Sequence, residues 1–133
     1  VLNATWGEIK FETKSWIIPA ARMKAGKEHR IPLSEPAIAL LDRLEPKGLA
    51  DLIFPGLNRR KPLSNMAMLK TMHRLGVHYT PHGFRSTFRT WISEETNHSH
   101  EVTEAALAHV IGNKVVAADN RGDLFEKRRT LMI

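Results

Sequence analysis

Residues 82–91 read His82-Gly83-Phe84-Arg85-Ser86-Thr87-Phe88-Arg89-Thr90-Trp91. The aromatic residues recur at three- and four-residue spacing, which predicts an amphipathic helix over about residues 82–95 with its apolar stripe in the core. Pro81 and Gly83 mark the start of the helix, where the helix dipole favours an anion. His82 and Arg85 are three residues apart and share a face. There a guanidinium can bind two phosphate oxygens while an imidazole moves a proton. By spacing alone, the pair also fits an ordinary surface helix.

Upstream of this helix, the first third of the chain predicts a small β-sheet. Apolar residues alternate over residues 4–10, are dense over residues 15–19 and alternate again over residues 29–33. A polar turn containing Gly26, which can take a positive φ, precedes the third stretch. These segments predict a three-stranded antiparallel meander.

The remainder of the chain predicts helices. Ser34 is the expected N-cap of a helix over residues 35–44 with a stripe of leucines, and Ser64 caps another that Gly76 ends near residue 75. Further helices are expected over residues 82–95, 101–111, 115–118 and from residue 123 onward. The expected fold class is α+β, a small three-stranded antiparallel sheet followed by a mainly helical bundle in one domain.

The composition favours a polyanionic partner. Twenty Lys and Arg against fourteen Asp and Glu give 133 residues a net charge of +6. The chain has no cysteine, which excludes disulfides, thiolate metal sites and thiol nucleophiles. No apolar run approaches the roughly 20 residues of a membrane span and no signal peptide opens the chain, so we expect a cytoplasmic, nucleoid-associated protein with no membrane partner.

Both ends of the chain read as internal to a longer sequence. The chain begins at Val1 without a methionine, and it stops at Ile133 in an apolar-periodic stretch that has no cap or stop signal. We therefore expect residues 1–133 to be a fragment of a longer protein.

Two other short segments carry residues suited to phosphate chemistry. Leu107-Ala108-His109 precedes Gly112-Asn113, and the later segment reads Ala118-Asp119-Asn120-Arg121-Gly122-Asp123. A histidine near a helix end is usually structural, although the dipole there favours an imidazolium. Zinc is not expected, because Pro81 separates His78 from His82 and the chain has neither cysteine nor an HExxH motif.

Together, the string 82–91, Leu107-Ala108-His109 and the segment 118–123 resemble the catalytic half of tyrosine site-specific recombinases, the integrases of phages and genomic islands. The resemblance extends from Trp6 to Arg129. It implies the DNA breaking-rejoining fold, with residues 1–133 as a C-terminal catalytic fragment that lacks the arm-binding and core-binding domains. It also implies strand exchange through a 3′-phosphotyrosyl intermediate, without a metal, ATP or another cofactor.

The resemblance assigns a role to each candidate catalytic residue. Arg85 and His109 stabilise the scissile phosphate, and His82 is the general base. The turn before the third strand resembles the family hairpin whose lysine protonates the leaving 5′ oxygen, which implies Lys24, with Lys27 as a weaker candidate. Asp119 stands where the nucleophilic tyrosine is expected, and the first arginine of the family tetrad would fall upstream of Val1. We therefore expect a cleavage-defective chain, either an inactivated variant or a degenerate copy.

Further basic side chains are expected to contact DNA, namely Lys27, Arg59, Arg60, Lys61 and Arg89. The implied partners are double-stranded DNA attachment sites and other integrase protomers, which form a tetramer on DNA in the family. We expect Lys24, His82, Arg85 and His109 to converge on one basic concave face with Asp119 at its edge. The alternative is a non-catalytic DNA-binding or interaction module that retains the fold. A basic domain with no DNA role would leave the long motif match unexplained.

Overall fold

The computed structural model describes residues 1–44, 48–109 and 123–132. Three short strands form an antiparallel sheet in the order β1-β2-β3, with β1 at Ile9–Lys10, β2 at Ser15–Ile18 and β3 at His29–Pro32. Trp16 pairs with Ile9 on one side and with Ile31 on the other. The predicted three-stranded meander is confirmed, and Gly26 in the turn before β3 has a φ of 63°.

The first strand is much shorter than the sequence predicts. Residues 6–8 form a 3-10 turn, η1 (Trp6–Glu8), so that β1 keeps only two residues. The backbone of this stretch bonds to another segment instead, because Ala4 accepts from the Ile53 N–H at 2.9 Å and Gly7 donates to the Leu49 carbonyl at 2.7 Å. A Cβ on Gly7 would lie 3.0 Å from that carbonyl oxygen, so this approach favours glycine.

A first core lies where these segments meet. Its buried members are Ala4, Trp6, Ile9 and Ile53, and Trp16, Leu33, Leu41 and Phe54 pack partly against it. Helix α1 (Glu35–Asp42) supplies Leu41, whereas Leu40 and Leu44 of the predicted leucine stripe are exposed. Ser34 occupies the N-cap position of α1, but its side chain makes no capping hydrogen bond.

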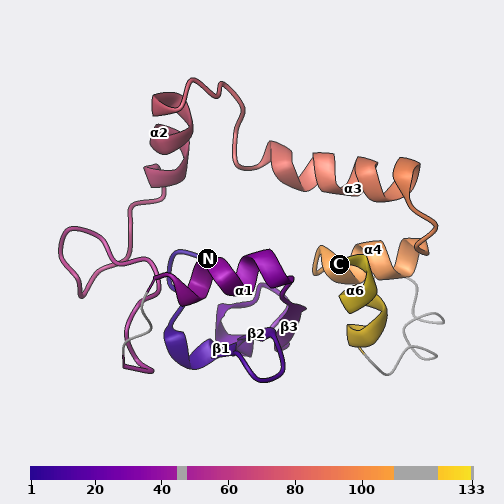
Figure 1. Ribbon diagram of the computed structural model, residues 1–133, viewed down its shortest axis with the longest axis horizontal. Coiled ribbons are helices and arrows are strands. Elements are labelled where there is room, and N and C mark those ends of the chain that lie inside the picture. The colour runs from indigo at the N-terminus through magenta and orange to yellow at the C-terminus, as the bar shows by residue number, and fades with distance from the viewer. Residues whose placement is uncertain (45–47, 110–122, 133) are drawn as a thin grey trace.

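A second core joins the helical part of the chain. Helices α3 (Gly83–Glu95), α4 (His100–Ala106) and α6 (Phe125–Leu131) bring together the buried residues Ile92, Val102 and Leu131. Figure 1 shows α6 beside α4, away from α1, and α6 also contacts strand β3. The chain after residue 82 is therefore tied to the sheet through its last described helix.

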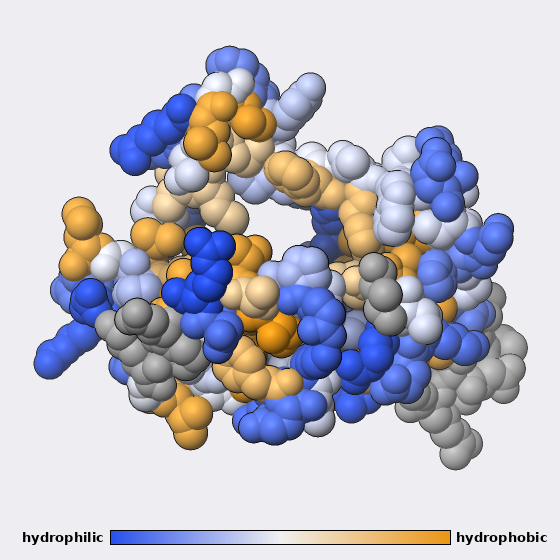
Figure 2. All heavy atoms as spheres, in the orientation of Figure 1, coloured by the Kyte–Doolittle hydropathy of each residue, from blue (hydrophilic) through white to orange (hydrophobic). Residues whose placement is uncertain are grey.

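The prediction that the whole aromatic stripe of α3 lies in the core is wrong. Phe84 is 61% exposed and Trp91 is 45% exposed, while Phe88 packs partly against the buried Ile92. Among the described helices, α3 packs on the seven-residue α4, which is too short to cover the whole length of the 13-residue α3. Figure 2 shows an opening between α2 and α3 on one side and the sheet and α1 on the other.

Helix α2 (Ala67–Arg74) begins three residues after the predicted Ser64 cap and buries none of its residues. Gly76, with a φ of 72°, follows it as the sequence predicts. Helix α4 ends at Ala106 rather than near residue 111, for a reason given below. The predicted helix over residues 115–118 lies outside the described residues, and the last predicted helix is confirmed as α6. Within the described ranges, no helix is long and apolar enough to cross a lipid bilayer.

Candidate functional site

His82 and Arg85 lie at the start of α3. His82 is the N-cap residue, its carbonyl accepts from the Arg85 N–H at 3.2 Å, and both residues are exposed. Thr80 fixes the turn before the helix, because its hydroxyl and its carbonyl both accept from the Gly83 N–H, at 3.3 and 3.0 Å. The Arg85 guanidinium is directed toward the end of α4, where its Nη2 donates to the carbonyl of Leu107.

The end of α4 explains where His109 lies. Ala108 has a φ of 54°, in the left-handed region. The N–H of Ala108 bonds to the Ala105 carbonyl at 3.1 Å, and the N–H of His109 bonds to the Glu104 carbonyl at 2.9 Å. These two bonds form a Schellman motif, which ends a helix at a residue in the left-handed conformation. His109 therefore stands just beyond α4 rather than within a longer helix.

Replacing Ala108 with glycine should stabilise the chain. A Cβ in the left-handed region costs roughly 1–2 kcal/mol, and the greater freedom of glycine in the unfolded state offsets part of that gain. We expect Ala108→Gly to raise the free energy of unfolding by about 0.5–1 kcal/mol, a few degrees in thermal midpoint. Ala105→Gly is the matched control. That residue lies in the last turn of α4, where glycine should instead cost about 0.5–1 kcal/mol. A midpoint that falls in both variants would contradict the strain at position 108.

Glu104 was not singled out by the sequence, yet it joins two of the candidate residues. Its carboxylate Oε2 lies 2.6 Å from His109 Nδ1, and Oε1 lies 3.2 Å from Nη2 of Arg89 on α3. Only 12% of the Glu104 side chain is exposed. Burial by itself raises the pKa of this carboxyl, but the hydrogen bond to His109 and the charges of Arg89, His109 and His100 outweigh it and lower the pKa below its ordinary value.

Arg85, Arg89, Glu104, Leu107 and His109 form what we call the α3–α4 cluster. One side of this cluster borders a cavity of about 340 Å³ whose lining includes Arg85, Phe84, Phe88, Leu107 and Arg128. The structure therefore brings Arg85, Arg89 and His109 together. Since Arg85 and His109 come from motifs more than twenty residues apart, only the packing of α3 on α4 joins them.

The other basic candidates lie elsewhere. Lys24 and Lys27 are exposed in the turn between β2 and β3. Arg59, Arg60 and Lys61 are exposed on a loop that a bond from the Gly56 N–H to the Lys61 carbonyl closes at 2.8 Å. This loop, which precedes α2, lies at the opposite end of Figure 1 from α4. Within the described residues, no hydrogen bond or ion pair links it or Lys24 to the α3–α4 cluster. Asp119 lies outside the described residues.

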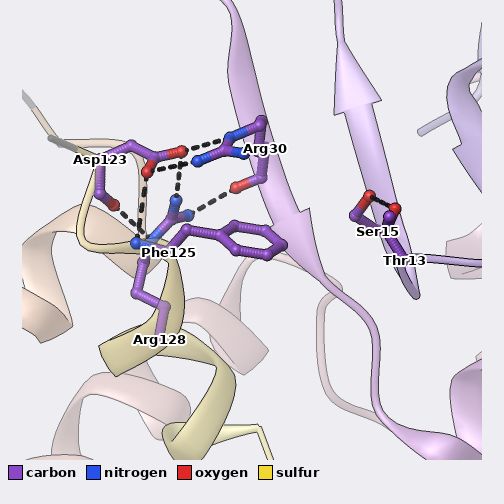
Figure 3. A network of polar contacts seen from close by, with 6 residues as sticks. All are labelled: Thr13, Ser15, Arg30, Asp123, Phe125 and Arg128. Atoms are coloured by element: carbon purple, nitrogen blue, oxygen red, sulfur yellow. Dashed lines mark hydrogen bonds and ion pairs between the residues drawn. The ribbon is translucent and has the colours of Figure 1, made fainter.

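A second polar network, which the sequence did not predict, fastens α6 to the sheet (Figure 3). Arg30 on β3 donates from Nε and Nη2 to the two oxygens of the Asp123 carboxylate, at 2.7 and 2.9 Å. Arg128 donates to the Arg30 carbonyl at 2.6 Å and to the Asp123 carbonyl at 2.8 Å. The Arg30 guanidinium also stacks 4.5 Å from the centre of the Phe125 ring. Arg30 lies more than ninety residues from Asp123, Phe125 and Arg128 in the sequence, so no local pattern could reveal these contacts.

Two arginines of this network, Arg30 and Arg128, share the Asp123 carboxylate. The hydrogen bond from Arg30 lowers the pKa of the Asp123 carboxyl, burial opposes this, and the net shift is downward. Burial lowers the pKa of the Arg128 guanidinium, which is 1% exposed.

Among the described residues, no group of three or more His, Cys, Asp or Glu side chains could hold a metal ion.

Comparison with known proteins identifies relatives of the chain. The sequence profile of the Phage integrase family matches residues 1–117. Prophage integrase IntA of Escherichia coli (strain K12) is 40% identical over 134 residues, which cover 98% of this chain and 32% of the relative. The integrase of Shigella phage Sf6 is 33% identical over 132 residues, 96% of this chain and 34% of its own length. The chain thus spans about a third of the length of these curated relatives. No solved structure matches the chain significantly.

Proposed function

Because this chain belongs to the phage integrase family, we propose that it is the catalytic part of a longer site-specific recombinase and that it binds duplex DNA through the α3–α4 cluster. The observation that carries the proposal is the meeting of Arg85 and His109, which sequence motifs single out separately, at one junction of two helices. The partners would be DNA attachment sites and, on DNA, other protomers of the same integrase.

The α3–α4 cluster offers the groups that a phosphate needs. Arg85 donates one N–H to the Leu107 carbonyl. A guanidinium has five N–H donors, so further donors of Arg85 can bind phosphate oxygens. Arg89 lies one turn further along α3 and is about half exposed. Fixed cations at this place would stabilise the negative charge that grows on the non-bridging oxygens during cleavage.

Proton transfer in this proposal belongs to His82 and Lys24. His82 precedes Arg85 by one helical turn and is exposed, so it could take the proton of an attacking hydroxyl. Lys24, with Lys27 as the weaker candidate, would protonate the leaving 5′ oxygen. Both lysines lie in an exposed turn, and such turns commonly move when a ligand binds.

Asp119 makes the chain, in this proposal, defective in DNA cleavage. An aspartate side chain is several ångströms shorter than that of tyrosine, and its carboxylate brings negative charge toward a phosphate. An acyl phosphate formed there would hydrolyse, so the energy of the broken phosphodiester bond would be lost. Asp119 also favours the second candidate function, a DNA-binding module that has lost the ability to cleave DNA.

We expect the chain to bind DNA weakly and with little sequence preference. Phosphate contacts alone give dissociation constants of about 10⁻⁴ to 10⁻⁶ M, and neutralising three phosphates implies a roughly 40-fold loss of affinity for a fourfold rise in salt. Fluorescence anisotropy with a random duplex and an attachment-site duplex, each at two salt concentrations, measures both quantities.

The same titration can locate the binding surface. Arg85→Ala should weaken binding and reduce the salt dependence by about one phosphate contact. Arg43→Ala, which removes one exposed charge at the end of α1, is the matched control and should change neither. An absence of binding at low salt, or equal losses in the two variants, would contradict the proposed interface.

A further inference from the structure

We propose that Glu104 is a positioning residue that holds the Nδ1–H edge of the His109 ring, so that only Nε2 is left for a DNA phosphate and phosphate binding requires the imidazolium form of the ring. This inference rests on the proposed function, because it concerns how the α3–α4 cluster binds a phosphodiester.

Glu104 fixes His109 at two points. The backbone carbonyl of Glu104 accepts the His109 N–H at 2.9 Å, and its carboxylate lies 2.6 Å from Nδ1 of the ring. The first contact belongs to the Schellman motif, which fixes the position of the His109 backbone just beyond the end of α4. The second determines how the ring is turned, since Nδ1 must face Glu104. Nε2 then lies on the far side of the ring from the carboxylate.

The chemistry of the carboxylate sets the tautomer. The pKa of Glu104 lies below its ordinary value, so the group is ionised at neutral pH and can only accept hydrogen bonds. His109 must therefore carry its proton on Nδ1. In the neutral ring, Nε2 is then a lone-pair acceptor, which repels a phosphate oxygen. Only the imidazolium has a second N–H to donate. A phosphate bound through Nε2 of His109 thus requires the imidazolium form of the ring.

The other charged groups around the His109–Glu104 pair are arginines and two histidines. Arg89 on α3 shares the Glu104 carboxylate, Arg85 on α3 binds the Leu107 carbonyl, and Arg128 on α6 lines the adjoining cavity. Arginines stay charged throughout. His100 on α4 acts on Glu104 through its charge, and His82 stands one turn before Arg85. Any test must therefore separate His109 from these two histidines.

Glu104→Gln isolates the effect, because the amide keeps the size of the side chain. A glutamine can donate its own N–H₂ to Nδ1, which permits the neutral ring to carry its proton on Nε2 and donate to phosphate without taking up a proton. The wild-type chain should lose about tenfold in affinity for a random duplex between about pH 5.5 and 8, the equivalent of one charge-assisted hydrogen bond. Over the same pH range, the Glu104→Gln variant should lose much less of its affinity for the duplex. At pH 8 it should bind the duplex more tightly than the wild type does.

Histidine variants provide the controls. His109→Gln should remove most of the pH dependence, whereas His82→Gln, His100→Gln and, on the distant α2, His73→Gln should each leave the greater part of it. A purely structural role for Glu104 would lower binding by Glu104→Gln at every pH, and this result would overturn the inference. An unchanged pH dependence in that variant would overturn it as well.

A second readout needs no DNA. Long-range proton–nitrogen NMR spectra of the free chain should show neutral His109 with its proton on Nδ1, and Glu104→Gln should shift the population toward Nε2–H. If the wild-type chain binds no duplex at low salt, the proposed function fails while this tautomer measurement still decides the role of Glu104. A neutral wild-type ring protonated on Nε2 would refute that role even if DNA binds.

Discussion

Replacing Arg128 with methionine is expected to lower the free energy of unfolding by about 3–5 kcal/mol, a large part of the total stability of a small domain. Arg128 is 1% exposed, and methionine would leave two backbone carbonyls, those of Arg30 and Asp123, without their donors. It would also remove the ion pair at 3.2 Å between Arg128 and the Asp123 carboxylate. Urea denaturation measures the loss directly.

Arg129→Met is the matched control on the same helix. Arg129 also faces the Phe125 ring, at 4.9 Å, but its ion-pair partner Glu126 is 80% exposed, so the change should cost about 1 kcal/mol or less.

The two variants should also respond differently to acid. The pKa of Asp123 is lowered in the folded state, so the contribution of this carboxylate to the free energy of unfolding is present above the ordinary pKa of 3.8. It is lost as the pH falls through the folded-state pKa. The difference in free energy of unfolding between the wild type and Arg128→Met should therefore become smaller at low pH. Equal losses for the two variants at neutral pH would show that α6 is not held by this network.

In the proposed function, a tyrosine at position 119 is expected to restore covalent chemistry only together with the first arginine of the family tetrad, which the family resemblance places upstream of Val1. The present chain should give no covalent adduct on a nicked suicide substrate, since Asp119 cannot form a stable phosphate ester. Asp119→Tyr in this chain should remain at least 10²- to 10³-fold slower than in a protein extended upstream through the first arginine, because one donor to the phosphate oxygens is absent. In the extended protein, Asp119→Tyr should trap a 3′-phosphotyrosyl species that denaturing gels detect.

The controls separate the two candidate functions. Arg85→Ala in the extended, tyrosine-restored protein should abolish the adduct, which ties the product to the α3–α4 cluster. An adduct formed by the unaltered chain would mean that another residue attacks, and the assignment of position 119 would be wrong. Failure of the extended, tyrosine-restored protein on its own attachment site would instead favour a binding module.

Local sequence was enough to predict the order of the sheet and most of the helices. Strand β3 and helix α3 have strong periodicity, strand β2 is a dense apolar run, and all three lie close to their predicted limits. The errors occur where distant segments compete for backbone groups or leave a face uncovered. Strand β1 is short because residues 49–53 take the hydrogen bonds of residues 4–7. Phe84 and Trp91 are exposed although the spacing predicts a fully buried stripe, and the seven-residue α4 is too short to cover the whole 13-residue α3.

The candidate site divides in the same way. Arg85 and His109 could be singled out because the short motifs that contain them resemble those of the recombinase family. Glu104 could not be, since a glutamate five residues before a histidine becomes its partner only when the helix ends between them. The helix ends there because Ala108 adopts a left-handed conformation, and the sequence has no glycine at this position that would predict such an end.

The sequence by itself determined the family, the antiparallel sheet, the charge that favours DNA and the residue types available for catalysis, because periodicity, composition and motif order are properties of the chain alone. Only the tertiary structure decided which of these residues meet. Arg85 reaches the Leu107 carbonyl, and Arg30 reaches an aspartate 93 residues away, through the packing of α3 on α4 and of α6 on β3. Contacts between segments so far apart depend on how complete faces fit together, and no local pattern in the sequence contains that information.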